Sequence, residues 1–98
     1  DLARPITEVV AAFQQGCMRP NASVPTILVN NAGVFIDTPF LDMDESTFQR
    51  TFQINVSIGY FLTQLFARYW IQNGLEGRVL FTGSINGLLS EPTHTAYD

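Results

Sequence analysis

The sequence contains no lysine: its positive side chains are five arginines, set against nine acidic residues, and the formal net charge is −4. Proteins that bind nucleic acid neutralise phosphates with a basic patch or stripe of side chains. No such stripe occurs along this chain. We therefore expect no nucleic-acid partner.

Cysteine and histidine are almost as scarce, with one of each in the chain. The single cysteine, Cys17, excludes a disulfide within the chain and is typical of a reducing compartment. We interpret His94 as a solvated loop residue, because no carboxylate or metal-ligand partner is evident for it. We expect no metal site.

Long hydrophobic runs are also missing. No apolar stretch approaches the roughly 20 residues that a membrane-spanning helix needs. The sequence does not open with a signal-peptide pattern either. We therefore expect a cytoplasmic protein without a membrane partner.

Charged residues as a whole make up 14% of the chain, against about 25% in a typical soluble domain, whereas hydrophobic residues make up 46%. A chain of 98 residues forms at most one small domain and buries a modest share of its surface. This composition is that of the interior of a larger protein. Because the sequence also opens on Asp1 rather than Met, we interpret residues 1–98 as a fragment of a single domain.

The most informative stretch is 26–33, which reads Thr-Ile-Leu-Val-Asn-Asn-Ala-Gly. Its unbroken apolar run predicts a buried strand of a parallel sheet with helices on both faces. The two amides and the glycine that follow predict a polar turn at the carboxyl end of the strand, where open α/β sheets bind their ligands.

A helix is predicted before this strand, over residues 1–15, because apolar residues recur there at helical spacing. Pro5 suits its first turn. Gly16 is the expected end of the helix.

A longer helix is predicted after the strand, from about residue 44 to about residue 72, with Asp42 or Asp44 as its cap and Gly74 as its terminator. A second buried strand is predicted over residues 78–83. A strand, a helix and a second strand in this order form a right-handed parallel crossover. The fold class is therefore α/β.

Three polar side chains converge on one sheet edge in this topology: Ser84 ends the second strand, Tyr97 follows its loop, and Asn55 lies on the helix between the strands. Taken alone, Ser84 is an ordinary turn residue, Tyr97 a packed ring, and Asn55 a tether from helix to backbone. A phenol ionises only near about pH 10, so a tyrosine that acts as a base needs positive charge beside it. The lysine that could supply this charge is missing.

The order and spacing of four short motifs resemble the classical branch of the short-chain dehydrogenase/reductase family. The motifs are Asn30-Asn31-Ala32-Gly33, the helix residue Asn55, Thr82-Gly83-Ser84 followed by Gly87, and Pro92 with Tyr97. The resemblance implies a Rossmann-like, doubly wound parallel sheet. Residues 1–98 would be a fragment of a single NAD(P)-binding domain that lacks the N-terminal glycine-rich turn and the C-terminal strands.

The resemblance also implies roles for individual residues. Ser84 would hydrogen-bond the oxygen of an alcohol or carbonyl substrate, Tyr97 would exchange a proton with that oxygen, and Asn55 would hold a water of the proton relay. The cofactor would be NAD or NADP. Its contacts would come from the turn Asn30, Asn31, Ala32 and Gly33 and from the pair Asp1 and Leu2. A homodimer or homotetramer is usual in the family.

The departures from the family pattern matter as much. The glycine-rich turn that holds the pyrophosphate is absent, and the lysine expected at the fourth position after Tyr97 lies beyond the last residue. We therefore expect the fragment alone to be inactive. The alternative is a nucleotide-binding or interaction protein that has kept the fold and lost catalysis, but joint retention of Ser84, Tyr97 and Asn55 favours the enzyme.

Overall fold

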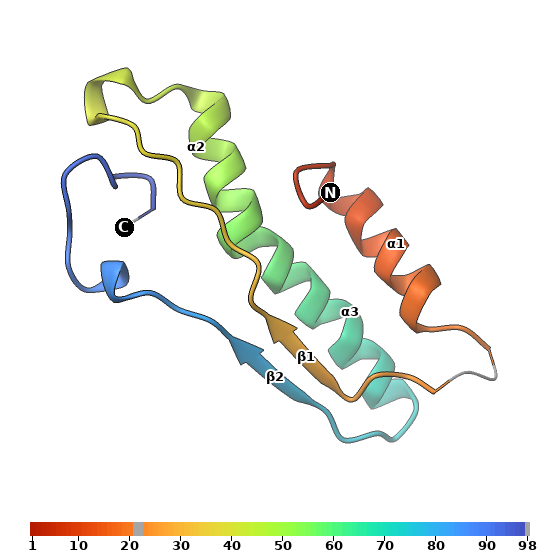
Figure 1. Ribbon diagram of the computed structural model, residues 1–98. Coiled ribbons are helices and arrows are strands. Elements are labelled where there is room, and N and C mark those ends of the chain that lie inside the picture. Colours follow the sequence, from red (N-terminus) through yellow and green to blue (C-terminus); the bar gives the residue numbers. More distant parts are fainter. Residues whose placement is uncertain (21–22, 98) are drawn as a thin grey trace.

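The computed structural model describes residues 1–20 and 23–97. The elements are α1 (Ile6–Cys17), β1 (Ile27–Asn30), the 3-10 turn η1 (Phe40–Asp42), α2 (Glu45–Phe52), the π-helical segment η2 (Gln53–Ser57), α3 (Ile58–Gln72), β2 (Arg78–Phe81) and the 3-10 turn η3 (Ile85–Gly87). Figure 1 shows the two strands side by side, α2 and α3 forming one long rod next to them, and α1 against α3.

The two strands pair in parallel, with Ile27 opposite Arg78 and Asn30 opposite Phe81. The predicted strand, helix and parallel strand are thus confirmed, although both strands are shorter than expected. Backbone bonds extend the pairing by one residue at each end, from Arg78 N to Thr26 O (2.9 Å) and from Thr82 N to Asn30 O (2.9 Å). The segments that leave the two carboxyl ends therefore start side by side.

One hydrophobic cluster joins α1, β1 and α3. Its buried members are Val9, Leu28, Ile58, Leu62, Phe66 and Trp70. Because successive side chains of a strand point to opposite faces, Leu28 marks the face that the helices cover. On the other face Ile27, Val29 and Leu80 are 60%, 56% and 53% exposed. Within the described residues, helices cover one face of the sheet and not both, in contrast to our expectation.

The ends of α1 also differ from the prediction. The helix begins at Ile6 and not at Asp1, because Asp1 to Arg4 close a turn of their own through bonds from Arg4 N to Asp1 O and from Ala3 N to the Asp1 carboxylate. Gly16 does not end the helix, which continues to Cys17. Apart from its chain neighbours and the backbone of its own helix, nothing lies within 4 Å of a Cβ built on Gly16, so this residue occupies an open helical position.

The long helix has the predicted ends. The Asp44 carboxylate caps α2 by accepting from Thr47 N at 2.6 Å. Gly74, with a φ of 64°, follows the end of α3. Between the two helices the chain widens into η2, which the periodicity did not predict. Such π-helical turns are rare and frequently occur at functional sites, and this one carries Asn55.

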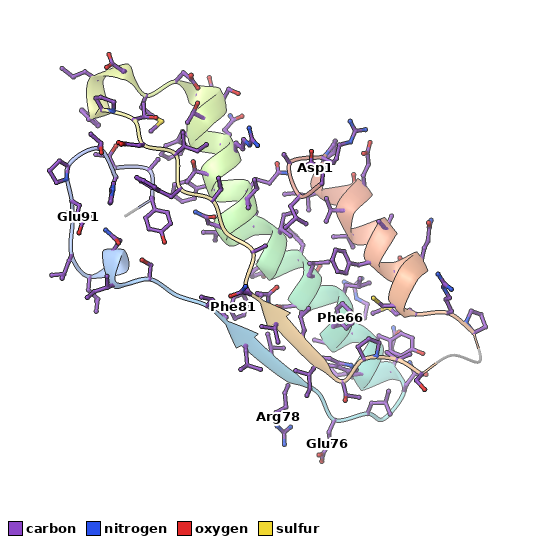
Figure 2. The ribbon with its side chains drawn as sticks, in the orientation of Figure 1. Asp1, Phe66, Glu76, Arg78, Phe81 and Glu91 are labelled. Carbon is purple, nitrogen blue, oxygen red and sulfur yellow. The ribbon has the colours of Figure 1, made fainter. Side chains whose placement is uncertain are left out.

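The far end of the sheet is fixed by the single tryptophan. Trp70 is buried, and its indole Nε1 donates to Pro25 O at 2.9 Å. Its ring lies against Gly77, just before β2: a Cβ built on Gly77 would lie 2.1 Å from ring atom Cε3. Beyond this contact Glu76 and Arg78 point away from the molecule, as Figure 2 shows. Only glycine fits between the indole and the strand.

We predict that Gly77→Ala destabilises the protein by about 1–3 kcal/mol, because overpacking must displace a buried ring or the strand behind it. Urea unfolding followed by the fluorescence of Trp70 measures the change directly. The control is Gly16→Ala, which adds a methyl group in open space inside α1 and should stabilise by about 0.5–1 kcal/mol. Equal unfolding midpoints for Gly77→Ala and wild type would contradict the packing described here.

The cap of α2 predicts a pH dependence. The Thr47 backbone N–H, and then its side chain, lower the pKa of Asp44 below its ordinary value of 3.8. A lowered folded-state pKa stabilises the protein above the unfolded-state value, and this contribution is lost as pH falls through the folded-state value. Asp44→Ala should therefore lower the Tm at pH 7, and its difference from wild type should narrow in acid. Circular dichroism melts measure the Tm values, with Asp42→Ala, outside the cap, as the control.

Candidate active site

A cavity of about 460 Å³ opens at the carboxyl edge of the two strands. It is lined from four parts of the chain: the turn after β1, η2, the end of β2, and the C-terminal loop. The lining residues are Asn31, Ala32, Gly33, Val34, Phe35, Asn55, Val56, Thr82, Gly83, Ser84 and Tyr97. The structure thus brings the three predicted catalytic residues to one cavity, together with three of the predicted cofactor residues.

Asn55 ties η2 to the turn that follows β1. Its Oδ1 accepts from Val34 N at 2.7 Å, and its Nδ2 donates to Val34 O at 2.8 Å. The tether that the sequence suggested is therefore confirmed. A carboxamide has two donor hydrogens and two acceptor lone pairs, so one of each remains after the bonds to Val34. A role in holding water stays a prediction.

Ser84 lies two residues beyond Thr82, the last residue bonded to the β1 strand, and caps the short turn η3. Its Oγ accepts from Asn86 N at 3.2 Å and donates to Asn86 Oδ1 at 3.3 Å. No hydrogen bond joins the hydroxyls of Ser84 and Tyr97, both of which belong to the described chain. Ser84 is exposed at the cavity wall, so its hydroxyl is accessible to a small molecule.

Tyr97 belongs to a C-terminal loop that folds back on the segment after β1. Thr38 N donates to Thr93 O at 3.2 Å, and Tyr97 N donates to His94 O at 2.8 Å. The ring of Phe35 packs edge-on against both His94 and Tyr97, with centroids 4.2 and 5.5 Å away. In Figure 1 the two segments lie next to each other, the yellow chain after β1 and the blue C-terminal loop.

The surroundings of His94 contradict our interpretation of it as a solvated loop residue. Its side chain is only 19% exposed, and Nδ1 lies 3.3 Å from Glu91 Oε2 and 3.2 Å from Asn86 Nδ2. The loop turns back between Glu91 and His94, where His94 N donates to Glu91 O, so residues three apart meet on one side. His94 is thus neither solvated nor without a carboxylate. The Glu91-x-x-His94 spacing was the available signal.

The two amides of the turn after β1 are both engaged within the protein. Asn30 Nδ2 donates to Thr63 Oγ1 on α3 at 3.2 Å, and Asn31 Oδ1 accepts from Thr82 Oγ1 beyond β2 at 2.8 Å. Gly59 permits the first contact, because a Cβ there would lie 3.4 Å from Asn30 Cγ and 2.9 Å from the Phe81 ring. These bonds fix the edge of the cavity. Cofactor binding by the two amides stays a prediction.

The two residues of the predicted N-terminal pair, Asp1 and Leu2, differ in their surroundings. Leu2 lines a smaller cavity of about 120 Å³ that it shares with Asn30, Asn31 and Ala32, whereas Asp1 does not line it. The Asp1 carboxylate accepts instead from Ala3 N at 2.8 Å. Sequence reasoning missed Gln53, whose Nε2 donates to the carbonyls of Leu2 (2.8 Å) and Arg4 (2.7 Å) and so ties the N-terminal turn to η2.

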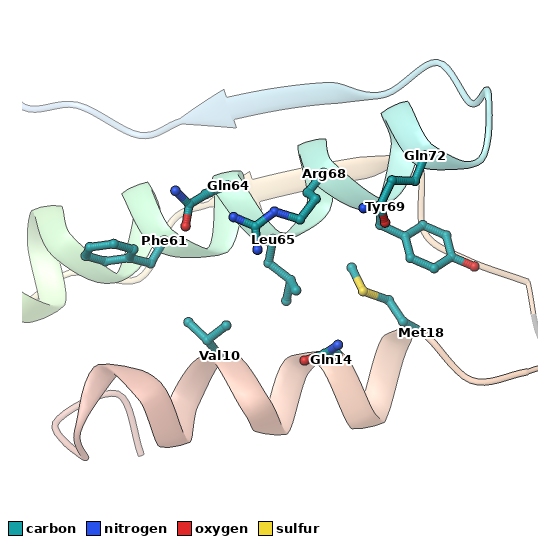
Figure 3. A pocket seen from close by; sticks show the side chains of 9 residues that line it. All are labelled: Val10, Gln14, Met18, Phe61, Gln64, Leu65, Arg68, Tyr69 and Gln72. Atoms are coloured by element: carbon teal, nitrogen blue, oxygen red, sulfur yellow. The ribbon is translucent and has the colours of Figure 1, made fainter.

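Other features of the described residues carry less chemistry. A cavity of about 190 Å³ lies between α1 and α3 (Figure 3), and neither Ser84 nor Tyr97 lines it. It is lined by Val10, Gln14, Met18, Phe61, Gln64, Leu65, Arg68, Tyr69 and Gln72.

Among residues 1–20 and 23–97 no group of three or more histidine, cysteine or acidic side chains could hold a metal ion. No helix there is long and apolar enough to cross a membrane.

Known proteins match most of this chain. A profile of the short chain dehydrogenase family matches residues 7–98. Carbonyl reductase (NADPH) 2 of Sus scrofa is 34% identical over 71 residues, which cover 72% of this chain and 29% of that protein. L-rhamnose 1-dehydrogenase (NADP(+)) of Thermoplasma acidophilum is also 34% identical over 71 residues, which cover 72% of this chain and 28% of that protein. The chain thus spans less than a third of the length of these relatives.

Solved structures share the fold. A structure of 4-hydroxyisoleucine dehydrogenase complexed with NADH superposes with a TM-score of 0.87 and 27% identity, covering 99% of this chain and 41% of that one. A 7α-hydroxysteroid dehydrogenase complexed with NADH and 7-oxo glycochenodeoxycholic acid superposes with a TM-score of 0.81 and 31% identity, covering 99% and 36%. The two parallel strands and their helices correspond to part of a Rossmann fold, and the chain belongs to the short-chain dehydrogenase/reductase family.

Proposed function

We propose that this chain is the central part of an NAD(P)-dependent oxidoreductase that interconverts an alcohol and a carbonyl, with Tyr97 as the acid/base. The observation that carries the proposal is that Ser84, Tyr97 and Asn55 together line the cavity of about 460 Å³ at the carboxyl edge of the sheet. Family membership supports the same reaction class. Because the relatives are more than three times as long as the matched region, we assign the activity to a longer protein that contains this sequence.

In the proposed reaction Ser84 donates its hydroxyl hydrogen to the substrate oxygen and holds the carbonyl in place. Tyr97 gives a proton to that oxygen in reduction and takes it back in oxidation. A water held at the free amide positions of Asn55 resupplies the proton, while the bonds to Val34 keep the amide still. Each role uses a group that lines the cavity.

The cofactor proposed is NAD or NADP, which supplies or accepts the hydride when bound. The residues at the cavity fit part of such a group. Ala32, Gly33 and Gly83 have little or no side chain, and apart from its chain neighbours nothing lies within 4 Å of a Cβ built on Gly83. Asn31, Ala32 and Leu2 would border its adenosine side, and Asp1 its adenine. Relatives named for NADPH or NADP(+), and structures complexed with NADH, support this cofactor class without choosing between the two.

Assembly into a homodimer or homotetramer is part of the proposal. Four apolar side chains recur every fourth residue along the long helical rod: Phe48, Phe52, Val56 and Tyr60, which are 44%, 44%, 56% and 63% exposed. A row of exposed apolar groups of this kind is typical of a protein interface. A second copy of the whole protein is the proposed partner, and we propose a cytoplasmic location from the single cysteine.

We predict that Tyr97→Phe in the longer protein abolishes turnover and leaves cofactor binding intact, since it removes one oxygen atom and keeps the ring contact with Phe35. A loss of at least about 100-fold is expected for a general acid/base. Absorbance of the reduced nicotinamide, followed with a panel of alcohols and ketones, measures it. The 98-residue chain, assayed alone, should be inactive.

The matched control is Tyr69→Phe, which removes a phenolic oxygen from α3 beside the cavity of Figure 3, away from Ser84. It should retain activity. Unchanged turnover in Tyr97→Phe would end the proposed mechanism. Cofactor binding with no turnover in the wild-type protein would favour the nonenzymatic nucleotide-binding alternative.

We predict that Asn55→Ala lowers the free energy of unfolding by about 1–3 kcal/mol, because the N–H and C=O of Val34 both lose their partners. When turnover is measured under conditions in which the variant is folded, it should still be lower than that of the wild type, because the loss of stability then has no effect. Urea unfolding and steady-state kinetics separate the two effects. Asn73→Ala, which removes an exposed bond to Tyr69 O, is the control; equal effects of the two substitutions would refute the tether.

A further inference from the structure

The first four residues form a turn that one side chain of the long helical rod holds in place. Gln53 Nε2 donates to Leu2 O at 2.8 Å and to Arg4 O at 2.7 Å. A carboxamide nitrogen carries two hydrogens, so both are used on this turn. Within residues 1–20 and 23–97, no other hydrogen bond joins residues 1–4 to a part of the protein beyond α1.

The shape of the turn and its position have separate causes. Its shape comes from short-range bonds, since the Asp1 carboxylate accepts from Ala3 N at 2.8 Å and Arg4 N donates to Asp1 O at 3.2 Å. These bonds stay within the turn and do not hold it against the rod. Figure 1 shows the N-terminus beside the rod where α2 passes into α3, and the two bonds from Gln53 join them there.

The π-helical segment η2 carries a second tether, Asn55, which bonds the backbone of Val34 after β1. Residues two apart on a helix do not face each other, so the amides of Gln53 and Asn55 reach different segments. One holds the N-terminal turn and the other holds the turn after β1. The segment η2 therefore sets the positions of both turns relative to each other.

The two turns border neighbouring cavities. Leu2 lines the cavity of about 120 Å³, and Tyr97 lines the cavity of about 460 Å³. Asn31, Ala32 and Asn55 line both, so the two cavities follow one another along the carboxyl edge of the sheet. A dinucleotide has its reacting nicotinamide at one end and its adenosine at the other. When the nicotinamide lies beside Tyr97, the adenosine extends toward Leu2.

We propose that Gln53 is a positioning residue for the cofactor, which holds the N-terminal turn where Leu2 and Asp1 meet the adenosine half of the dinucleotide. The inference rests on the proposed function, which supplies the dinucleotide. Gln53 itself donates nothing to the cofactor, because both of its amide hydrogens are taken by the turn. Without these bonds the turn has other positions open to it. The apparent affinity then falls by the fraction of molecules in which the turn is in place.

Gln53→Glu removes both bonds while it keeps the shape of the side chain. An ionised carboxylate only accepts hydrogen bonds, so Leu2 O and Arg4 O lose their donor. The matched control is Gln49→Glu, the same change of charge four residues earlier on α2. Gln49 is exposed, bonds only the Glu45 carboxylate, and lines neither of the two cavities.

The test measures two quantities in the longer protein: the Kd of the reduced dinucleotide, from the fluorescence of its nicotinamide, and kcat for ketone reduction at saturating cofactor. The dinucleotide is NADH or NADPH, whichever the wild type binds more tightly. In Gln53→Glu the Kd should rise about 5- to 25-fold, the ratio that one or two typical net hydrogen bonds support, and kcat should fall by a smaller factor. Asn55→Ala should show the reverse, with the larger effect on kcat. Gln49→Glu should retain the wild-type Kd.

An unchanged Kd in folded Gln53→Glu overturns the inference. A fall in kcat as large as the rise in Kd also overturns it, because Gln53 would then act on the neighbouring Asn55 and not on the adenosine site. If Gln53→Glu does not fold, Gln53→Leu, which removes both donors without adding charge, is measured in the same way. A wild-type protein that binds neither NADH nor NADPH refutes the proposed function itself, whereas tight wild-type binding that Gln53 does not affect refutes this inference alone.

Discussion

The parallel pairing of β1 with β2 is the constraint on which the site depends. Asn30 lies opposite Phe81, and the last backbone bond joins Thr82 N to Asn30 O. Asn31 and Ser84 follow this bond by one and two residues along their own segments. Asn55 is held at the same edge by its bonds to Val34, and Tyr97 by its ring contact with Phe35. A slip of one residue would turn alternate side chains to the other face, moving Leu28 out of the core and Asn30 away from α3.

Side-chain amides continue the order of the sheet where its backbone pairing ends. A carboxamide carries a donor and an acceptor in the same arrangement as a peptide group. Asn55 uses both on Val34, much as a neighbouring strand would. Asn31 Oδ1 accepts a hydrogen bond from the Thr82 hydroxyl of the adjacent segment. The turn after β1 can therefore leave the sheet and remain rigid. This explains why amides and not charged side chains follow the apolar run.

Local signals predicted the parts of the fold that short-range interactions determine. The Asp44 cap is a contact over three residues, and Gly74 ends α3 with the positive φ that glycine tolerates. The resemblance named the residues that meet at the cavity. The π-helical turn could not be predicted from local sequence, because it accompanies a bond between Asn55 and Val34, 21 residues apart. The environment of His94 was missed because its contact with Glu91 forms only after the loop has turned.

The open face of the sheet explains the unusual composition. Parallel sheets are normally covered on both sides, and their strands read as continuous apolar runs. Residues 27–29 have this pattern, yet Ile27 and Val29 are more than half exposed while Leu28 between them is buried. The low charge content is consistent with the same pattern, because a charged side chain is costly to bury under a second layer. Ile27 and Val29 thus have the apolar character of strand residues that lie under a second layer, although this face is exposed within the described residues.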